Sequence, residues 1–409
     1  MAYTLTNDIF VREENRIGQK IYRRSINKSV WNKLIPKETW PDGMGDQIQA
    51  ITIERNLPSD TDTWENVVTI SGTDTTGTCV PTEYEVPSGS TSRNYRLKQK
   101  ALTSEDVCVD TTRGAFRVRE QTRLMFRNLT RAVSYVWKRK GLTEYASLCE
   151  HKMIATHGLP ENAAAFPAIA ATSVLTQKML NRVYMNLVHD SAEEDGGSLG
   201  MADGRPQFIL VTDAEASDAI MRETNNANAF LYNSNRVPEL LQPLGVDRAI
   251  RGFYHLIDNL PPRWNFTGGA WVEVSPYTSV AATKGTKSKI ASAYREADYM
   301  DSYVFLPSVI NYMVPRPVST QGSKTRWNPQ AYMGTFKWLN IQDRTINPLN
   351  QIGFYYALLQ SAVKPCFPDF GYVIRHKRCP ADLDHTDCDE TGSLAASSLL
   401  GTNDSFFVV

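Results

Sequence analysis

The regular spacing of hydrophobic residues between positions 109 and 156 predicts a long amphipathic helix. This stretch has no proline, and its apolar side chains recur three or four positions apart, as they do on one face of a helix. These apolar positions are Met125, Leu129, Ala132, Val133 and Val136. A second set recurs every four residues and is cationic: Arg119, Arg123, Arg127 and Arg131. An unbroken helix of about 30 residues would be about 45 Å long, so we expect a strut with one packed face and one basic stripe.

Elsewhere the hydrophobic pattern changes period and predicts a second helix over 172–189 and a series of strands. The strand candidates are 51–57, 66–71, 83–86, 207–212, 271–274, 303–306, 335–341, 352–359 and 371–377. Strand 207–212 runs into Thr212-Asp213-Ala214-Glu215, a capping-box sequence that predicts a further helix. Helices in the middle of the chain and strands towards its end favour an α+β fold.

Two stretches have too little apolar surface to form cores of their own. Residues 1–45 show no buried periodicity, but Trp31 and Trp40 lie among basic residues there, so we expect an arm that packs on the rest of the fold or on another subunit. The candidate inter-subunit residues of this arm are Arg23, Arg24, Trp31 and Trp40. Residues 71–92 contain thirteen Ser, Thr or Gly among twenty-two, which predicts a long two-stranded excursion or a flexible linker.

Charge is segregated along a chain that is neutral as a whole. Lys plus Arg and Asp plus Glu both total 44. Residues 111–140 nevertheless carry nine basic and one acidic side chain, whereas 381–409 carry six carboxylates and no Lys or Arg. Such segregation indicates either complementary surfaces between chains or ordinary solvated faces. The beginning of the sequence lacks an apolar signal-peptide core, no apolar run reaches the ~20 residues of a membrane span, and the six cysteines are expected to be reduced thiols in the cytoplasm.

Motifs that would indicate catalysis or metal binding are weak. Ser198 lies in a G-x-S-x-G pattern, but the acidic residues before it replace the apolar strand that a nucleophile elbow requires. His376, Cys379, His385 and Cys388 are ligand types that suit zinc, yet their spacing is unlike that of standard fingers. No Walker or dinucleotide-binding loop is present. We therefore expect no catalytic residue, no metal and no cofactor.

Several long segments resemble the major capsid proteins of tailed bacteriophages, which share the Hong Kong ninety-seven type of capsid fold. The central segment is LLQPLGVDRAIRGFYHLIDNLPPRWN at 240–265. The others are TWPDGMGDQIQAITIERNLP at 39–58, ATKGTK at 282–287, VFLPSVINYMVPRP at 304–317 and the stretch from NPQAYMG to VIRHKRC at 328–379. The likeness touches most of the chain in a consistent order.

This resemblance implies a division into parts and a function. It implies an N-terminal arm at 1–45, an extended β loop at 46–104, a peripheral domain with the spine helix at 105–164, an axial domain at 165–315, and a return to the peripheral domain with a C-terminal tail at 316–409. The implied protein is a non-enzymatic shell subunit that assembles through pentamers and hexamers into an icosahedral virion capsid around phage DNA. Its arginine stripe, Arg119, Arg123, Arg127 and Arg131, would then face the lumen and the non-specifically packaged DNA.

The implied partners are further copies of the chain, a portal protein, and scaffolding or decoration proteins, with no membrane. Assembly would take place in the host cytoplasm. Two alternatives stay open: another virion structural protein, such as a tail or decoration component, and a hydrolase with an unrecognised site.

Overall fold

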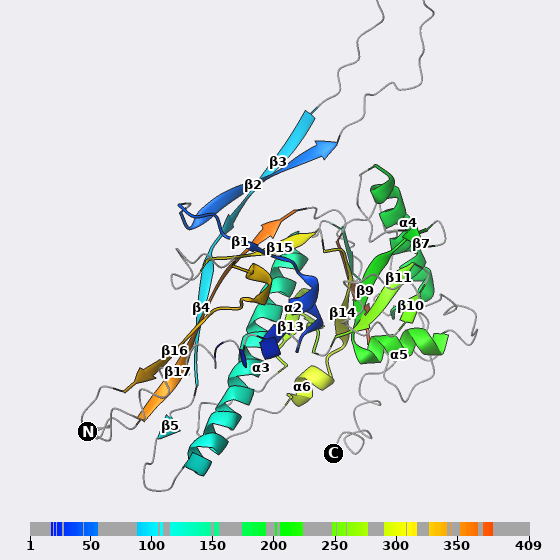
Figure 1. Cartoon of the computed structure of the whole chain (residues 1–409). Coiled ribbons are helices and arrows are strands. Elements are labelled where there is room, and N and C mark those ends of the chain that lie inside the picture. The colour runs from blue at the N-terminus through cyan, green and yellow to red at the C-terminus, as the bar shows by residue number, and fades with distance from the viewer. Residues whose placement is uncertain are drawn as a thin grey trace, which may run out of the picture.

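A computed structural model describes most of the segments that carry regular structure. The described residues are 18–55 without 19, 22, 27 and 44, then 88–104, 107–108, 115–148, 151–154, 174–193, 201–202, 205–223, 248–250, 252–258, 260–276, 290–307, 309–316, 327–341, 345, 352–366 and 371–378. Within these ranges the chain combines two large sheets with one long helix (Figure 1), so the predicted α+β class is confirmed. None of the described helices is long and apolar enough to cross a membrane.

Helix α3, Ala115–Leu148, is the long helix that the sequence predicts. Its 34 residues correspond to about 50 Å at 1.5 Å per residue. Side chains at helical spacing are buried along it: Met125, Leu129, Val133, Trp137, Leu142 and Tyr145. The helix also approaches strand β15 closely, because a Cβ atom on Gly141 would lie 2.1 Å from the Tyr312 hydroxyl. A side chain at position 141 would therefore push the two elements apart.

The larger sheet has eight strands, in the order β10, β11, β9, β14, β12 and β13, with β18 and β6 added beside β14. Its strands are β6 (His151–Ile154), β9 (Phe208–Thr212), β10 (Arg248–Ile250), β11 (Phe253–Ile257), β12 (Arg263–Thr267), β13 (Ala270–Val274), β14 (Tyr299–Phe305) and β18 (Tyr372–Lys377). Helix α3 packs on one face, where Tyr145 contacts Tyr303 and Phe305. Helix α4 (Gln177–Glu193) packs on the other, where Tyr184 contacts Phe208.

The smaller sheet is organised around β17, Ile352–Pro365, which is its longest strand. Alternate residues of β17 are buried over most of its length, as expected for a strand with one face on a core. It pairs with β16 (Thr335–Asn340), β15 (Ile310–Val314), β4 (Lys98–Thr103) and β5 (Val107–Cys108), while β1 (Lys37–Thr39) joins the edge of β15. One continuous hydrophobic cluster links this sheet, α3 and the larger sheet.

The remaining described elements are short or project from the two sheets. They are α2 (Val30–Leu34), α5 (Ala214–Glu223), α6 (Ser292–Arg295), the 3-10 turn η5 (Pro329–Ala331), the pair β7 (Met201–Ala202) and β8 (Arg205–Pro206), and the hairpin strands β2 (Gln47–Arg55) and β3 (Ser88–Arg96). Figure 1 shows the β2–β3 hairpin extending away from both sheets.

A buried ionic contact joins the N-terminal segment, α3 and the larger sheet. The Lys138 ammonium lies 2.5 Å from the Asp258 carboxylate, and both side chains are about 5% exposed. The Trp31 indole donates a hydrogen bond to the same carboxylate oxygen at 3.2 Å. Burial lowers the pKa of Lys138 and raises that of Asp258, and their mutual attraction opposes both shifts. Lys138 also donates to the carbonyl of Leu260, whose positive φ of 62° aims that oxygen at the helix.

The structure corrects three sequence predictions. Within 109–156, which the sequence predicts to be mainly helical, α3 ends at Leu148 and residues 151–154 form a strand that pairs in parallel with β18. Trp31 is fully buried in its own chain, against Tyr303 and Phe305, so it cannot serve as the inter-subunit contact that we predicted for it. Trp40 is 6% exposed and packs against Tyr95, so its indole cannot serve as a predicted inter-subunit contact either. Both indoles fix the arm to its own subunit.

His376 is buried in the larger sheet as a neutral ring. Its Nδ1 lies 3.0 Å from the carbonyl oxygen of Lys377, and since a carbonyl can only accept, this nitrogen carries the proton. Its Nε2 then accepts from the Ser302 hydroxyl at 2.9 Å. Burial lowers the pKa of His376 from 6.5 to about 4. The hydrogen bond to Lys377 opposes this shift without cancelling it.

We predict that Asp258→Asn destabilises the fold by about 3 kcal/mol, because it leaves the buried Lys138 ammonium without a counter-charge. Combining it with Lys138→Met should recover most of this loss, because no buried charge then remains unpaired. Urea unfolding of the two single variants and the double variant gives the coupling energy. The matched control is Lys98→Met, which breaks the exposed pair with Glu144 and should cost less than about 1 kcal/mol. Additive losses in the cycle would show that the pair is not coupled.

We predict that acidification through the range 6.5 to 4 weakens the fold through His376. The folded-state pKa of about 4 lies below the unfolded value of 6.5, so the unfolded chain binds the proton more readily in this window. The contribution is fully present above pH 6.5 and is lost as pH falls towards 4, to a total of about 3 kcal/mol. Urea unfolding at a series of pH values should show a steeper fall for the natural chain than for His376→Gln. Parallel curves would mean that the ring does not titrate in this way.

Candidate functional site

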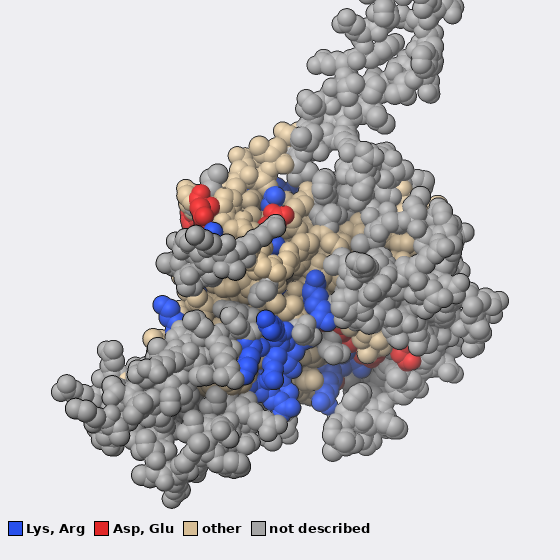
Figure 2. All heavy atoms as spheres, viewed as in Figure 1, with Lys and Arg blue, Asp and Glu red and all other residues tan. Residues whose placement is uncertain are grey.

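Five exposed cations gather where the N-terminal segment lies along α3, and we call them the basic face: Arg23, Arg24, Lys28, Arg127 and Arg131. The two elements are tied together by side chains between these cations. The Ser25 hydroxyl donates to the carbonyl of Thr130 at 3.2 Å, and the Asn32 amide donates to the carbonyl of Ser134 at 3.2 Å. Figure 2 shows basic side chains gathered over the part of the molecule where these elements lie in Figure 1.

The exposure of this face follows from the amphipathic pattern of α3. Leu129 and Val133 are buried in the core, whereas Arg127 and Arg131 are exposed on another side of the helix. The predicted separation of an apolar face from a cationic stripe is therefore seen for this half of the stripe. The side chains of Arg119 and Arg123 lie outside the described residues, although α3 includes their backbone. The sequence did not predict that Arg23 and Arg24 would lie beside the same stripe.

The β2–β3 hairpin is the second candidate surface. Its two nine-residue strands pair over their full length, from Gln47 opposite Arg96 to Arg55 opposite Ser88. They form a sheet of their own with two strands. A small cluster at the base of the hairpin holds it to the smaller sheet: Trp40, Ala50, Tyr95, Met313 and Ala362. Beyond this cluster the strands leave the core.

The outer part of the hairpin exposes apolar side chain and backbone. Ile51 is 66% exposed, although isoleucine is a residue that proteins usually bury. An isolated two-stranded hairpin is at best marginally stable in water, and its free edges present unpaired backbone groups. The geometry therefore suits pairing with, or packing on, another protein surface.

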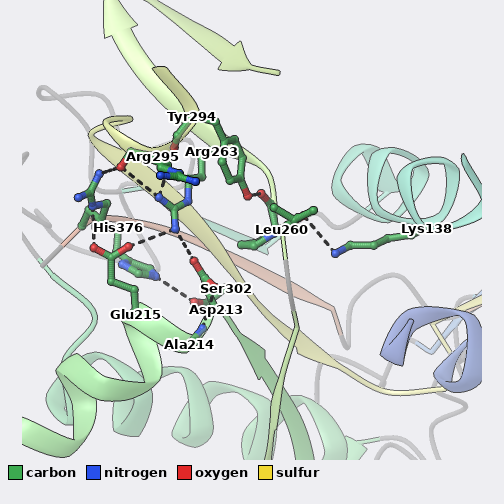
Figure 3. Close-up of polar contacts among 12 residues, drawn as sticks. Lys138, Asp213, Ala214, Glu215, Leu260, Arg263, Tyr294, Arg295, Ser302 and His376 are labelled. Carbon is green, nitrogen blue, oxygen red and sulfur yellow. Dashed lines mark hydrogen bonds and ion pairs between the residues drawn. The ribbon is translucent and has the colours of Figure 1, made fainter. Parts of the chain in front are cut away.

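A third feature is an ionic junction around Arg263, shown in Figure 3. The Arg263 guanidinium lies 2.6 Å from the Asp213 carboxylate and 3.1 Å from that of Glu215, and Arg378 donates to Glu215 at 2.7 Å. Burial raises the pKa of Glu215, and the two arginines partly offset this effect. The junction fixes the start of α5 to β12 and to the end of β18.

The same junction corrects the predicted capping box. Helix α5 begins at Ala214, as the sequence predicts, but the Thr212 hydroxyl pairs with the Nε2 atom of His255 at 2.6 Å. The Glu215 carboxylate is held by arginines instead of turning back to the helix start. Asp213 caps the helix, since its carboxylate accepts from the backbone N–H of Ala214 at 2.7 Å. His255 thus holds the Thr212 hydroxyl, and two arginines distant in sequence hold the Glu215 carboxylate, away from the predicted capping box.

The residues considered for catalysis or zinc binding are only partly described. Ser198, Cys379, His385 and Cys388 lie outside the described residues. Of the four zinc candidates only His376 is described, and both its ring nitrogens have partners within the sheet. Among the described residues, no group of His, Cys, Asp and Glu is arranged to hold a metal ion.

Sequence reasoning missed a stacked arginine on the larger sheet. The Arg375 guanidinium lies 3.8 Å from the centroid of the Trp264 ring and 4.9 Å from that of Trp271. It also pairs with Asp301 at 2.8 Å, and the Trp264 indole donates to the same carboxylate. The available signal was Asp301, an acidic residue within β14, all of whose residues are buried. A buried charge requires a partner, and Arg375 is that partner here.

Comparisons with known proteins give similarity at the level of structure alone. No family model and no curated protein sequence matches the chain. The chain is similar to the capsid of Ralstonia phage GP4, with a TM-score of 0.44, 11% identity, and coverage of 87% of this chain and 90% of that chain. The capsid of the cyanophage P-SCSP1u is similar with a TM-score of 0.43 and 12% identity, and the match covers 86% of this chain and 89% of that chain. The holo-SrpI encapsulin complex from Synechococcus elongatus PCC 7942 is similar with a TM-score of 0.35 and 11% identity, and the match covers 84% of this chain and 85% of that chain.

Proposed function

We propose that the chain is the major capsid protein of a tailed bacteriophage, which assembles through pentamers and hexamers into the icosahedral shell that encloses the phage DNA. The observation that carries this proposal is the β2–β3 hairpin, whose described strands form a separate two-stranded sheet that projects from the body (Figure 1). The order of hairpin, long helix and two sheets agrees with the parts that the sequence resemblance implies. The expected location is the virion, after assembly in the host cytoplasm.

The hairpin supports self-assembly because part of its apolar surface stays exposed in a single subunit. Its base contributes to the small cluster around Trp40, while Ile51 stays exposed further out. A contact between this hairpin and a different surface of the next copy would be heterologous. Contacts of this kind close into rings, including the five- and six-membered rings of a shell.

The basic face supports a role on the inner wall. Five exposed cations on a surface supported by a rigid helix offer charge to DNA phosphates and need no base readout. A shell that contains closely packed DNA requires contacts that are independent of sequence. Portal, scaffolding or decoration proteins would be further partners in this proposal.

We predict that a shortened hairpin separates folding from assembly. Thr52 pairs with Thr91, so replacing residues 52–91 by Asn-Gly would connect the paired residues Ile51 and Ser92 through a two-residue turn. The base cluster is preserved, so thermal melting should change by no more than about 5 °C. Sedimentation and electron microscopy should show capsomers or complete shells for the natural chain, expressed with a scaffold if one is required, and none for the variant. Normal shells from the variant, or a natural chain that stays monomeric in all conditions, would sink the proposal.

We predict that Arg127→Gln combined with Arg131→Gln weakens DNA binding without loss of folding. Both side chains are exposed, so the melting temperature should shift by no more than about 2 °C. The slope of log affinity against log salt for duplex DNA should fall in magnitude by about 2, because two phosphate contacts are removed. The matched control, Arg96→Gln with Lys100→Gln, removes the same charge from exposed positions outside the basic face. Equal slopes for the two double variants would contradict the assignment of this face to DNA.

A further inference from the structure

Among the described residues, the basic face has no counter-charges paired with it. The structure gives no ion pair to any of its five cations among the described residues, although Arg263, Arg375 and Arg378 in the same fold are all paired with carboxylates. Like charges brought together on two neighbouring elements repel one another. A surface of this kind therefore favours an anionic occupant.

The chain itself contains an anionic segment of matching charge. Residues 381–409 carry Asp382, Asp384, Asp387, Asp389, Glu390 and Asp404, with no Lys or Arg. This segment follows Arg378, which is fixed by its ion pair with Glu215. The chain from 379 to 409 could span up to about 100 Å when extended, about twice the length of α3. The segment is therefore long enough to contact the basic face.

We propose that the acidic segment 381–409 binds the basic face and competes there with nucleic acid. Charge complementarity supports the match, since the basic face has five cations without an ion pair among the described residues and the segment carries six carboxylates, in a chain whose formal net charge is zero. Attachment to the same chain gives the segment a high effective concentration at the face, of millimolar order for a flexible connection. Free subunits would thus be protected from unspecific nucleic acid, and concentrated DNA would displace the segment. This inference rests on the DNA-binding role proposed above, but its first test does not.

The first test is zero-length cross-linking of the full-length chain in its dissociated form. A carbodiimide activates a carboxyl group, which then forms an amide with a nearby lysine amine. Lys28 reports on the basic face, and Lys100 on β4 is a control that is also exposed, at a different place. Mass spectrometry should find cross-links from 382–390 to Lys28 in clear excess over Lys100, and 0.5 M salt should remove this excess because screening weakens exposed charge pairs. Equal yields at the two lysines would overturn the proposal, whether or not the protein forms shells. Mixing heavy and light chains shows whether the link is within one chain, as proposed, or between copies, which would overturn the intramolecular part.

The second test measures affinity for duplex DNA at about 50 mM salt. Asp387→Asn with Asp389→Asn and Glu390→Gln neutralises three carboxylates of the segment. The matched control, Asp42→Asn with Asp46→Asn and Glu296→Gln, neutralises three exposed carboxylates elsewhere. The segment variant should bind DNA about tenfold more tightly than the control, if each lost ion pair contributes a typical surface energy. A synthetic peptide of residues 381–409 should reverse the gain, and the same peptide with the three substitutions should be weaker.

The outcomes separate the two proposals. Preferential cross-links to Lys28 without any change in DNA affinity would keep the contact and reject the competition. Equal DNA affinities together with equal cross-linking would reject the whole inference and leave the capsid proposal standing. Preferential cross-linking in a chain that fails to assemble would reject the capsid proposal and keep the contact between the acidic segment and the basic face.

Discussion

The fold depends on a buried charge that joins three parts of the chain. Asp258 follows β11 and accepts contacts from Lys138 on α3 and from Trp31 on α2. An isolated carboxylate in this position would be strongly unfavourable, so the arrangement is stable only when the helix and the N-terminal segment are both in place. The Leu260 backbone, held at a positive φ, adds its carbonyl to the same ammonium. The position of the basic face follows from this constraint, because the contact with Trp31 helps to hold the N-terminal segment along α3.

Around this buried contact, buried aromatic side chains and exposed cations lie on different sides of the arm and of α3. Trp31 of the arm and Tyr145 of α3 are buried, and both rings contact Tyr303 and Phe305. The five cations of the basic face, on the same two elements, are exposed, whereas Lys138 is buried in its pair with Asp258. Burial of the apolar half of each element is what leaves its charged half available, so packing and the proposed DNA contact are two results of one amphipathic pattern.

Within the described residues, the hairpin and the basic face each leave groups exposed that another surface can cover. The hairpin presents backbone edges and Ile51 to water, and the face presents cations without described counter-charges. Both conditions are costly for an isolated subunit and are relieved by contact with a partner. In the proposed shell these exposed groups would find their contacts on other copies for the hairpin, and on the acidic segment or DNA for the basic face.

The sequence by itself determined the elements whose signal is local. The spacing of Leu129 and Val133 predicts α3, and the apolar runs at 207–212 and 352–359 predict β9 and β17, because each pattern depends on neighbours a few residues apart. The charge of 111–140 and of 381–409 is likewise readable from the chain. Only the tertiary structure decided that Trp31 lies beside Asp258, 227 positions away, that residues 151–154 extend the larger sheet, and that Ser25 of the N-terminal segment contacts Thr130 on α3. These contacts depend on which faces the packed core brings together, and no local period in the sequence records that choice.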